Sequence, residues 1–300
     1  MAEPRHFITG EELTGDELRA LVGRAEQLRS TGSSRTALPL RGRSVALIFE
    51  KPSTRTRVSL EVGVSQLGGH PVVLRGDELQ LTRGESVRDT AMVLSRYVAL
   101  IAVRSGDHEA VVELAEFSSA PVINALTPLH HPCQALADLL TLQQRFGMVK
   151  GLRLAYVGDG NNVCNSLMLL GAAAGVQVAV ATPPELRPDE AIVARAGSSV
   201  ELGDDPLAAA AGAHALYTDV WVSMGDEGDA AKRRKLLAPY QLNSELLTAA
   251  RDDAIVLHCL PAHPGEEITE DLLYGDRSAV WDQAENRLHA QKALLELLVA

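Results

Sequence analysis

The feature that most constrains the fold is a series of short, continuous apolar runs separated by stretches with helical spacing. Because these runs do not alternate apolar with polar residues, they predict strands covered on both faces, as in parallel sheets. Strands that alternate with helices are typical of an α/β fold. The first expected helix is Thr14–Arg29, with Thr14 and Glu17 as a capping box. The expected strands are Ser44–Phe49, Pro71–Leu74, Val98–Val103, Pro121–Ile123, Leu154–Val157, Val176–Ala181, Ala215–Thr218, Ala254–Leu257 and Ser278–Trp281.

Length and helix-ending residues divide the chain into two domains. A chain of 300 residues favours two domains of about 150 residues each. The helical pattern before Gly147 ends at that glycine, so we place the first domain at 1–147 and the second at 148–285. A C-terminal helix over 286–300 is expected to pack back on the first domain. The expected fold is therefore α/β, with two domains that are each a parallel sheet flanked by helices and are joined by two linking helices.

Charge and cysteine content exclude several classes of protein. There are 28 Lys and Arg residues against 39 Asp and Glu, a net charge of −11, which argues against a nucleic-acid or anionic-membrane partner. The three cysteines form no C-x-x-C pair, so we expect neither a disulfide framework nor a zinc site. Residues 1–10 lack the pattern of a signal peptide, and no apolar run reaches the roughly 18 residues of a membrane span. We therefore expect a soluble cytoplasmic protein.

Polar residues gather just beyond the carboxyl ends of the expected strands, where open α/β sheets bind ligands. This placement recurs along the chain, which ordinary surface polarity does not explain. The residues are Glu50–Arg57, Arg104, His131–Gln134, Gly158–Asn162, Asp219 and His258–Pro261.

The segment Ser53–Arg57, which reads S-T-R-T-R, predicts an anion site at a helix start. With Ser53 as N-cap, the first turn offers free backbone N–H groups, hydroxyls and a guanidinium to one anion. Arg55 and Arg57 lie about 200° apart on a helix, so only one of them faces a ligand squarely. Arg57 could instead pair with Glu61 one turn later. The alternative is an ordinary helix start with solvated arginines.

The segment His131-Pro132-Cys133-Gln134 also opens an expected helix. His131 and Gln134 are three residues apart and share a side of it. A neutral histidine and an amide could bind a small carbonyl or amide group. The alternative is that Gln134 caps its own helix and His131 packs in the core.

The glycine-rich turn Gly158–Asn162 does not match a nicotinamide-binding fingerprint. The position of the third glycine holds Val163, and the next strand is followed by Thr182 instead of an acidic residue for the ribose. We therefore expect no dinucleotide cofactor.

Two further strand ends carry reactive side chains. The segment Asp219–Gly225 holds an acid before a Ser-Met-Gly turn, although its tryptophan and methionine could equally be core residues. A nucleophilic pair of Cys259 and His258 is one interpretation of the other strand end. Adjacent side chains of a strand point to opposite faces, so His258 is poorly placed to activate Cys259.

In order along the chain, these motifs resemble the carbamoyltransferase family over nearly the whole sequence. The Ser-Met-Gly turn and the Cys259-Leu260 pair resemble its ornithine branch, since the aspartate branch typically has Pro-Leu at the second place. Leu129-His130 departs from the acidic–aromatic pair that is common before His131. The matching elements are Phe49-Glu50-Lys51, Ser53–Arg57, Gly84-Glu85-Ser86 with Asp89-Thr90, Arg104, His131-Pro132-x-Gln134, Gly158–Asn162, Asp219 with Ser223-Met224-Gly225, His258–Pro261 and Glu285-Asn286-Arg287.

The resemblance implies one domain for carbamoyl phosphate and one for ornithine, in a homotrimer with sites at subunit interfaces, and no metal or organic cofactor. It assigns a role to individual residues of this chain. The phosphate would be held by Ser53, Thr54, Arg55 and Thr56, and a neighbouring subunit's carbamoyl phosphate would be contacted by Gln80. The carbamoyl group would be held by Arg104, His131 and Gln134, with Arg287, Cys259 and Leu260 beside it. The amino acid would be held by Asn162, Asp219, Ser223 and Met224. The implied catalytic residues are Arg55, Arg104, His131, Gln134, Asp219, Cys259 and Arg287.

The implied reaction is transfer of the carbamoyl group of carbamoyl phosphate to the δ-amine of L-ornithine, giving citrulline and phosphate, with a place in arginine biosynthesis. Fixed cations and donors at the carbonyl oxygen and the phosphate suit the negative charge that develops there. Two alternatives stay open from the sequence. One is a carbamoyltransferase for putrescine or another amine, and the other is a non-catalytic phosphate-binding regulator.

Overall fold

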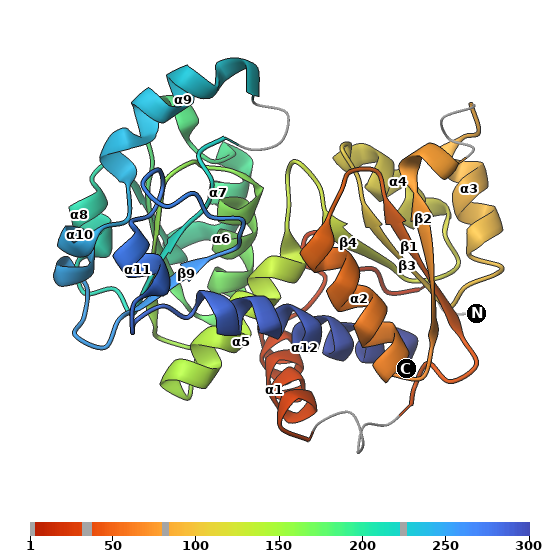
Figure 1. The fold of residues 1–300 in the computed structure, drawn as a ribbon. Coiled ribbons are helices and arrows are strands. Elements are labelled where there is room, and N and C mark those ends of the chain that lie inside the picture. The colour runs from red at the N-terminus through yellow and green to blue at the C-terminus, as the bar shows by residue number, and fades with distance from the viewer. Residues whose placement is uncertain (1–3, 32–37, 80–83, 223–226) are drawn as a thin grey trace. The chain divides into compact units, whose positions relative to one another are not determined.

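The computed structural model describes residues 4–31, 38–79, 84–222 and 227–300. Two compact units share the chain: unit 1 comprises 1–140 and 286–300, and unit 2 comprises 141–285. Helices α5 (Pro132–Phe146) and α12 (Val280–Val299) each run through a point of division between the units (Figure 1). The domain limits expected from the sequence, at 147 and 285, stay a prediction. None of the helices in the described residues has the length and apolar character needed to span a bilayer.

Unit 1 is built on a parallel sheet of four strands in the order β2-β1-β3-β4, within the described residues. Its central strands β1 and β3 are buried except for one end residue each because helices cover both faces, whereas the edge strand β2 is at most half-buried. Side chains of α3 and α4 close one face over Ala46, Ile48 and Ile101. The elements are α1 (Gly15–Thr31), β1 (Ser44–Phe49), α2 (Thr54–Gln66), β2 (His70–Arg75), α3 (Val87–Leu94), β3 (Leu100–Arg104), α4 (His108–Phe117) and β4 (Val122–Leu126).

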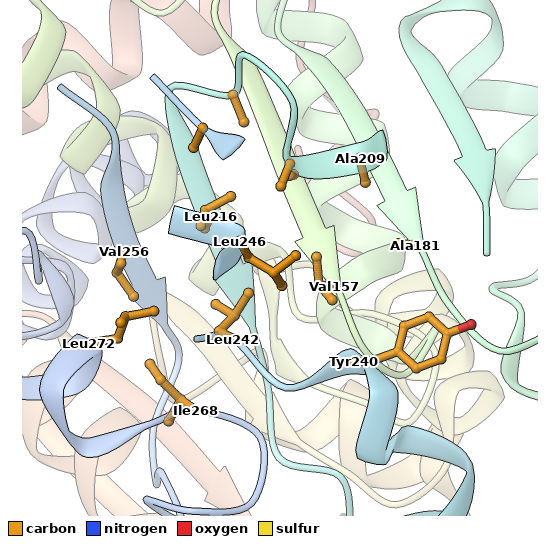
Figure 2. Close-up of a cluster of buried hydrophobic side chains, with 14 of the residues drawn as sticks. Val157, Ala181, Ala209, Leu216, Tyr240, Leu242, Leu246, Val256, Ile268 and Leu272 are labelled. Atoms are coloured by element: carbon orange, nitrogen blue, oxygen red, sulfur yellow. The ribbon is translucent and has the colours of Figure 1, made fainter. Parts of the chain in front are cut away.

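Unit 2 is built on a parallel sheet of five strands in the order β7-β6-β5-β8-β9, again within the described residues. Figure 2 shows its core, in which Val157, Leu216 and Val256 from three strands meet Leu242 and Leu246. The elements are β5 (Arg153–Val157), α6 (Asn162–Ala174), β6 (Gln177–Ala181), α7 (Glu190–Ala196), β7 (Val200–Gly203), α8 (Pro206–Ala210), β8 (Ala215–Thr218), α9 (Ala230–Leu237), α10 (Ser244–Ala249), β9 (Ile255–His258) and α11 (Glu270–Tyr274).

The structure confirms the expected parallel sheets. It differs from the expectation at two segments, one predicted strand that does not form and one strand that was not predicted. The run Ser278–Trp281 is not a strand: Ser278 forms an isolated bridge with Val256, and α12 begins at Val280. A four-residue apolar run has no period that separates a strand from a helix start, and here the following helix extends over it. Strand β7 was not expected, because this exposed edge strand has no apolar run to mark it.

Candidate functional site

The strand orders define where each unit can bind a ligand. In unit 1 the connections reverse direction between β1 and β3, and in unit 2 they reverse between β5 and β8. Open α/β sheets bind ligands at such switch points, beyond the carboxyl ends of the strands. The S-T-R-T-R segment follows β1 and Arg104 is the last residue of β3, while Gly158–Asn162 and Asp219 follow β5 and β8. The sequence motifs therefore lie at the two switch points.

The S-T-R-T-R segment opens α2, but its first hydroxyl does not act as expected. Ser53 occupies the N-cap position without a capping hydrogen bond from its side chain. Its Oγ instead accepts a hydrogen bond from Arg104 Nη1 at 3.0 Å, which ties the start of α2 to the end of β3. Thr54, the first helical residue, is exposed. Arg57 pairs with Glu61 at 2.6 Å, as the spacing predicted.

Arg287 joins three helices of unit 1 in one buried network. Its Nη2 donates to Thr56 Oγ1 on α2 at 2.9 Å, and its Nη1 donates to Gln134 Oε1 on α5 at 2.6 Å. Gln134 Nε2 donates to Asp138 Oδ1 one turn further along α5, at 2.9 Å. These four side chains are at least 96% buried. The network fixes which end of the Gln134 amide faces Arg287, so the interpretation of Gln134 as a helix cap is wrong.

The cations of unit 1 create a positive field at this switch point. Burial, followed by the charges of Arg287 and Arg55, lowers the pKa of Arg104 to about 10. Burial, followed by the charges of Arg287 and Arg104, holds the pKa of His131 well below its usual range, so this histidine is neutral near pH 7. Among the residues that the structure describes, no carboxylate forms an ion pair with Arg55 or Arg104. An anion bound here would relieve the mutual repulsion of the arginines.

In unit 2 an acidic side chain is held from two sides. Asp219 Oδ2 accepts a hydrogen bond from Asn161 Nδ2 at 2.7 Å, and its Oδ1 accepts one from Cys259 Sγ at 2.7 Å. Asn161 Oδ1 also caps α6 by accepting from the backbone N–H groups of Val163 and Cys164. The residue predicted from the sequence, the neighbouring Asn162, is the first helical residue. The preference of helix N-caps for asparagine is the signal that would have identified Asn161.

His258 does not serve Cys259 as a base. Its Nδ1 accepts the N–H of Leu260 at 2.9 Å, and its Nε2 lies 3.2 Å from Glu267 Oε1. The ligand atoms of Asp219, His258 and Cys259 lie within 4.8 Å of one another, a spacing found in metal sites. Because both ring nitrogens of His258 already have protein partners, the ring has no lone pair to offer an ion in this arrangement.

The sequence did not point to two charged groups, Asp138 and Arg233, and three predicted residues lie outside the described part of the chain. Asp138 could have been found four residues after Gln134 on the same helix face. The ion pair of Arg233 with Asp159 joins α9 to the glycine-rich turn, and Arg233 also donates to the Trp221 carbonyl. Sequence spacing could not show that pair, since its residues are 74 positions apart. The predicted residues outside the described part of the chain are Gln80, Ser223 and Met224.

Family models match both parts of the chain. Residues 5–144 match the carbamoyl-P binding domain of aspartate/ornithine carbamoyltransferase, and residues 150–298 match its Asp/Orn binding domain. A protein of Acidothermus cellulolyticus named ornithine carbamoyltransferase is 54% identical over 98% of this chain and 96% of its own length.

Solved structures with similar folds carry the same name. The ornithine carbamoyltransferase from Pyrococcus furiosus has a TM-score of 0.94 and 46% identity, over 99% of this chain and 97% of its own. The ornithine carbamoyltransferase from Thermus thermophilus has a TM-score of 0.91 and 46% identity, over 99% of both chains.

Proposed function

The chain belongs to the aspartate/ornithine carbamoyltransferase family, and from this premise we propose which of its residues hold each substrate. The chain transfers the carbamoyl group of carbamoyl phosphate to the δ-amine of L-ornithine. The products are citrulline and phosphate. The observation that carries our assignment of residues is the group of cations in unit 1, in which Arg287 and Arg104 act on a neutral His131 and Arg55 acts on Arg104.

In our proposal, unit 1 holds carbamoyl phosphate. The start of α2, from Ser53 to Thr56 with Arg55, binds the phosphate through backbone N–H groups, hydroxyls and the guanidinium. Arg104 lies between phosphate and carbonyl oxygen, and neutral His131 donates a hydrogen bond to that oxygen. Negative charge grows there in the tetrahedral intermediate, so these fixed donors bind the transition state more tightly than the substrate. Arg287 and Gln134 complete the contacts to the carbamoyl group.

Unit 2 is proposed to hold ornithine through Asn162, Asp219 and Cys259, together with Ser223 and Met224. The δ-amine must lose a proton before it attacks, because its ordinary pKa is close to that of lysine, about 10.4. The Asp219 carboxylate is proposed to accept a hydrogen bond from an ammonium group of ornithine. Hydrogen bonds from Asn161 and Cys259 hold this carboxylate in place. The departing phosphate accepts the proton that the attacking nitrogen releases. The Leu260 carbonyl, beside Cys259, is proposed to contact the reacting groups as well.

Amine selection tests the ornithine assignment. Ornithine differs from putrescine by its α-carboxylate, and a site that hydrogen-bonds a polar group leaves its own groups unpaired when that group is missing. We expect kcat/KM for ornithine to exceed that for putrescine at least about 10³-fold. Asn162→Ala should narrow the gap, and Asn243→Ala, a helix cap elsewhere in unit 2, should not. Similar kcat/KM values for the two amines would favour a putrescine enzyme, and no turnover with any amine would favour a regulator.

We also propose a homotrimer in which Gln80 completes a neighbour's site. The exposed side of α2 supports contact with a second copy, since it presents the apolar side chains of Val58 and Val62 to solvent. Mixed trimers made from inactive Gln80→Ala and Arg55→Ala subunits should regain activity, because some of their sites are intact. Hybrid trimers that stay inactive would count against a shared site.

A role in cytoplasmic arginine biosynthesis is the last part of the proposal. Cys133, Cys164 and Cys259, which all lie in the described residues, form no disulfide, and this supports a reducing compartment. Loss of the gene should leave cells dependent on added citrulline or arginine, whereas added ornithine should not restore growth. Growth without either supplement would point to a catabolic role.

A further inference from the structure

The turn that precedes α5 carries His131, the proposed donor to the carbamoyl oxygen. The Thr127 N–H donates to the His130 carbonyl at 2.9 Å, and the His130 N–H donates to Thr127 Oγ1 at 3.2 Å. Thr127 and His130 are both at least 99% buried. The fully buried Thr127 hydroxyl therefore fixes the backbone directly before His131.

His108, the first residue of α4, contacts both ends of this turn. Its Nδ1 lies 3.0 Å from Thr127 Oγ1. Its ring centroid lies 5.1 Å from that of His130, with the ring planes 58° apart. His108 is thus a side chain through which α4 contacts the turn.

The hydrogen-bonding capacity of Thr127 sets the protonation state of His108. Thr127 Oγ1 accepts from Asn124 Nδ2 at 3.3 Å and from the His130 N–H, which together use its two lone pairs. Its one O–H then donates to His108 Nδ1, which is closer than the His130 carbonyl at 3.4 Å. His108 Nδ1 must carry a lone pair, so the ring is neutral with its proton on Nε2.

The electrostatic surroundings agree with a neutral ring. Burial lowers the pKa of His108, and the nearby carboxylates of Glu109, Asp107 and Glu12 oppose this shift without cancelling it. A second proton would aim an N–H at an oxygen with both lone pairs in use. It would also place a positive charge against the buried His130 ring.

We propose that His108 is a positioning residue for carbamoyl phosphate: as a neutral acceptor it holds the Thr127 hydroxyl and, through the turn, His131. This inference rests on the proposed role of His131. It goes beyond that role because it makes the carbamoyl site depend on a residue of α4 that does not touch substrate. Protonation of His108 below its pKa then weakens carbamoyl phosphate binding.

Carbamoyl phosphate affinity, measured by titration calorimetry on the intact protein from pH 5.5 to 8, tests the proposal. His108→Ala removes the acceptor and should weaken binding about 3- to 10-fold at pH 8, the effect of one net hydrogen bond. His108→Asn places an amide oxygen near the Nδ1 position and cannot titrate. It should bind within about twofold of the unchanged protein at pH 8. The exposed His70→Asn in the same unit is the matched control.

The decisive readout is the affinity of the unchanged protein divided by that of His108→Asn at each pH, because the ionisation of carbamoyl phosphate cancels in this ratio. The ratio should fall progressively as the pH decreases toward 5.5, without reaching the full loss seen in His108→Ala because the pKa of His108 is lowered, and it should stay constant for His70→Asn. A constant ratio for His108→Asn, or unchanged binding in His108→Ala, would overturn the proposal. No binding by the unchanged protein at pH 8 would instead refute the proposed carbamoyl phosphate site.

Discussion

Gly160 lies where two backbone segments of unit 2 meet too closely for a side chain. A Cβ at this position would lie 2.2 Å from Pro188 N and 2.6 Å from both Arg187 C and Leu186 O. Its N–H donates to the Leu186 carbonyl at 2.9 Å. Gly160→Ala must therefore push the turn away from the segment after β6, and the adjacent Asn161, which holds Asp219, moves with it.

The size of this effect follows from the contacts. The shortest distance must open from 2.2 Å to at least 3.0 Å, and both sides of it are backbone. Overpacking of this kind costs about 1–3 kcal/mol, and a weakened backbone hydrogen bond adds about 0.5–1.5 kcal/mol. We expect a loss of about 2–4 kcal/mol, which lowers Tm by roughly 4–16 °C. A displacement near 1 Å at a positioning group should lower kcat/KM for ornithine roughly 10- to 100-fold.

Calorimetric melting and steady-state kinetics check both effects. Gly203→Ala is the matched control, because a Cβ there would meet no atom within 4 Å and the residue is outside the left-handed region. That control should change neither Tm nor kinetics appreciably. Carbamoyl phosphate affinity should be retained in Gly160→Ala, since the change lies in unit 2. A Gly160→Ala protein with unchanged Tm and ornithine kcat/KM would refute the reasoning.

Three further outcomes are expected. Arg55→Ala should reduce kcat and carbamoyl phosphate affinity by orders of magnitude through loss of a charge-assisted contact, whereas Arg57→Ala should mainly affect stability; equal kinetic losses would contradict this. Asn161→Ala and Asn243→Ala should each lose a helix cap worth about 1 kcal/mol in denaturant unfolding, but only Asn161→Ala should raise KM for ornithine. Because the pKa of His131 is lowered in the folded chain, this side chain binds a proton below about pH 6.5 in the unfolded chain but stays neutral in the folded chain. The free energy of unfolding therefore falls on acidification by up to about 1.4 kcal/mol per pH unit. His131→Gln should make Tm less sensitive between pH 7 and 5, and an unchanged pH dependence would exclude this origin.

Local patterns sufficed wherever a feature depends on neighbours in the chain. The capping box of Thr14 and Glu17 forms as expected, with each side chain accepting the other's backbone N–H. The pair of Arg57 and Glu61 also forms, because residues four apart share a helix face. Continuous apolar runs predicted the central parallel strands, since burial on both faces leaves no alternation. The gathering of reactive residues at strand ends followed from the same runs.

Tertiary structure decided every contact between residues far apart in the chain. Ser53 has the sequence signature of a helix cap, yet its hydroxyl accepts a hydrogen bond from Arg104 instead. The pairing of β1 with β3 brings the segment after β1 close to the carboxyl end of β3. Arg287 contacts Gln134 across 153 positions only because the part of α12 from residue 286 onward belongs to unit 1. The need for glycine at position 160 likewise arises from a segment near Pro188. Helix and strand periods are set by nearest neighbours, whereas the register of packed elements depends on the whole core, and the geometry of both sites depends on that register.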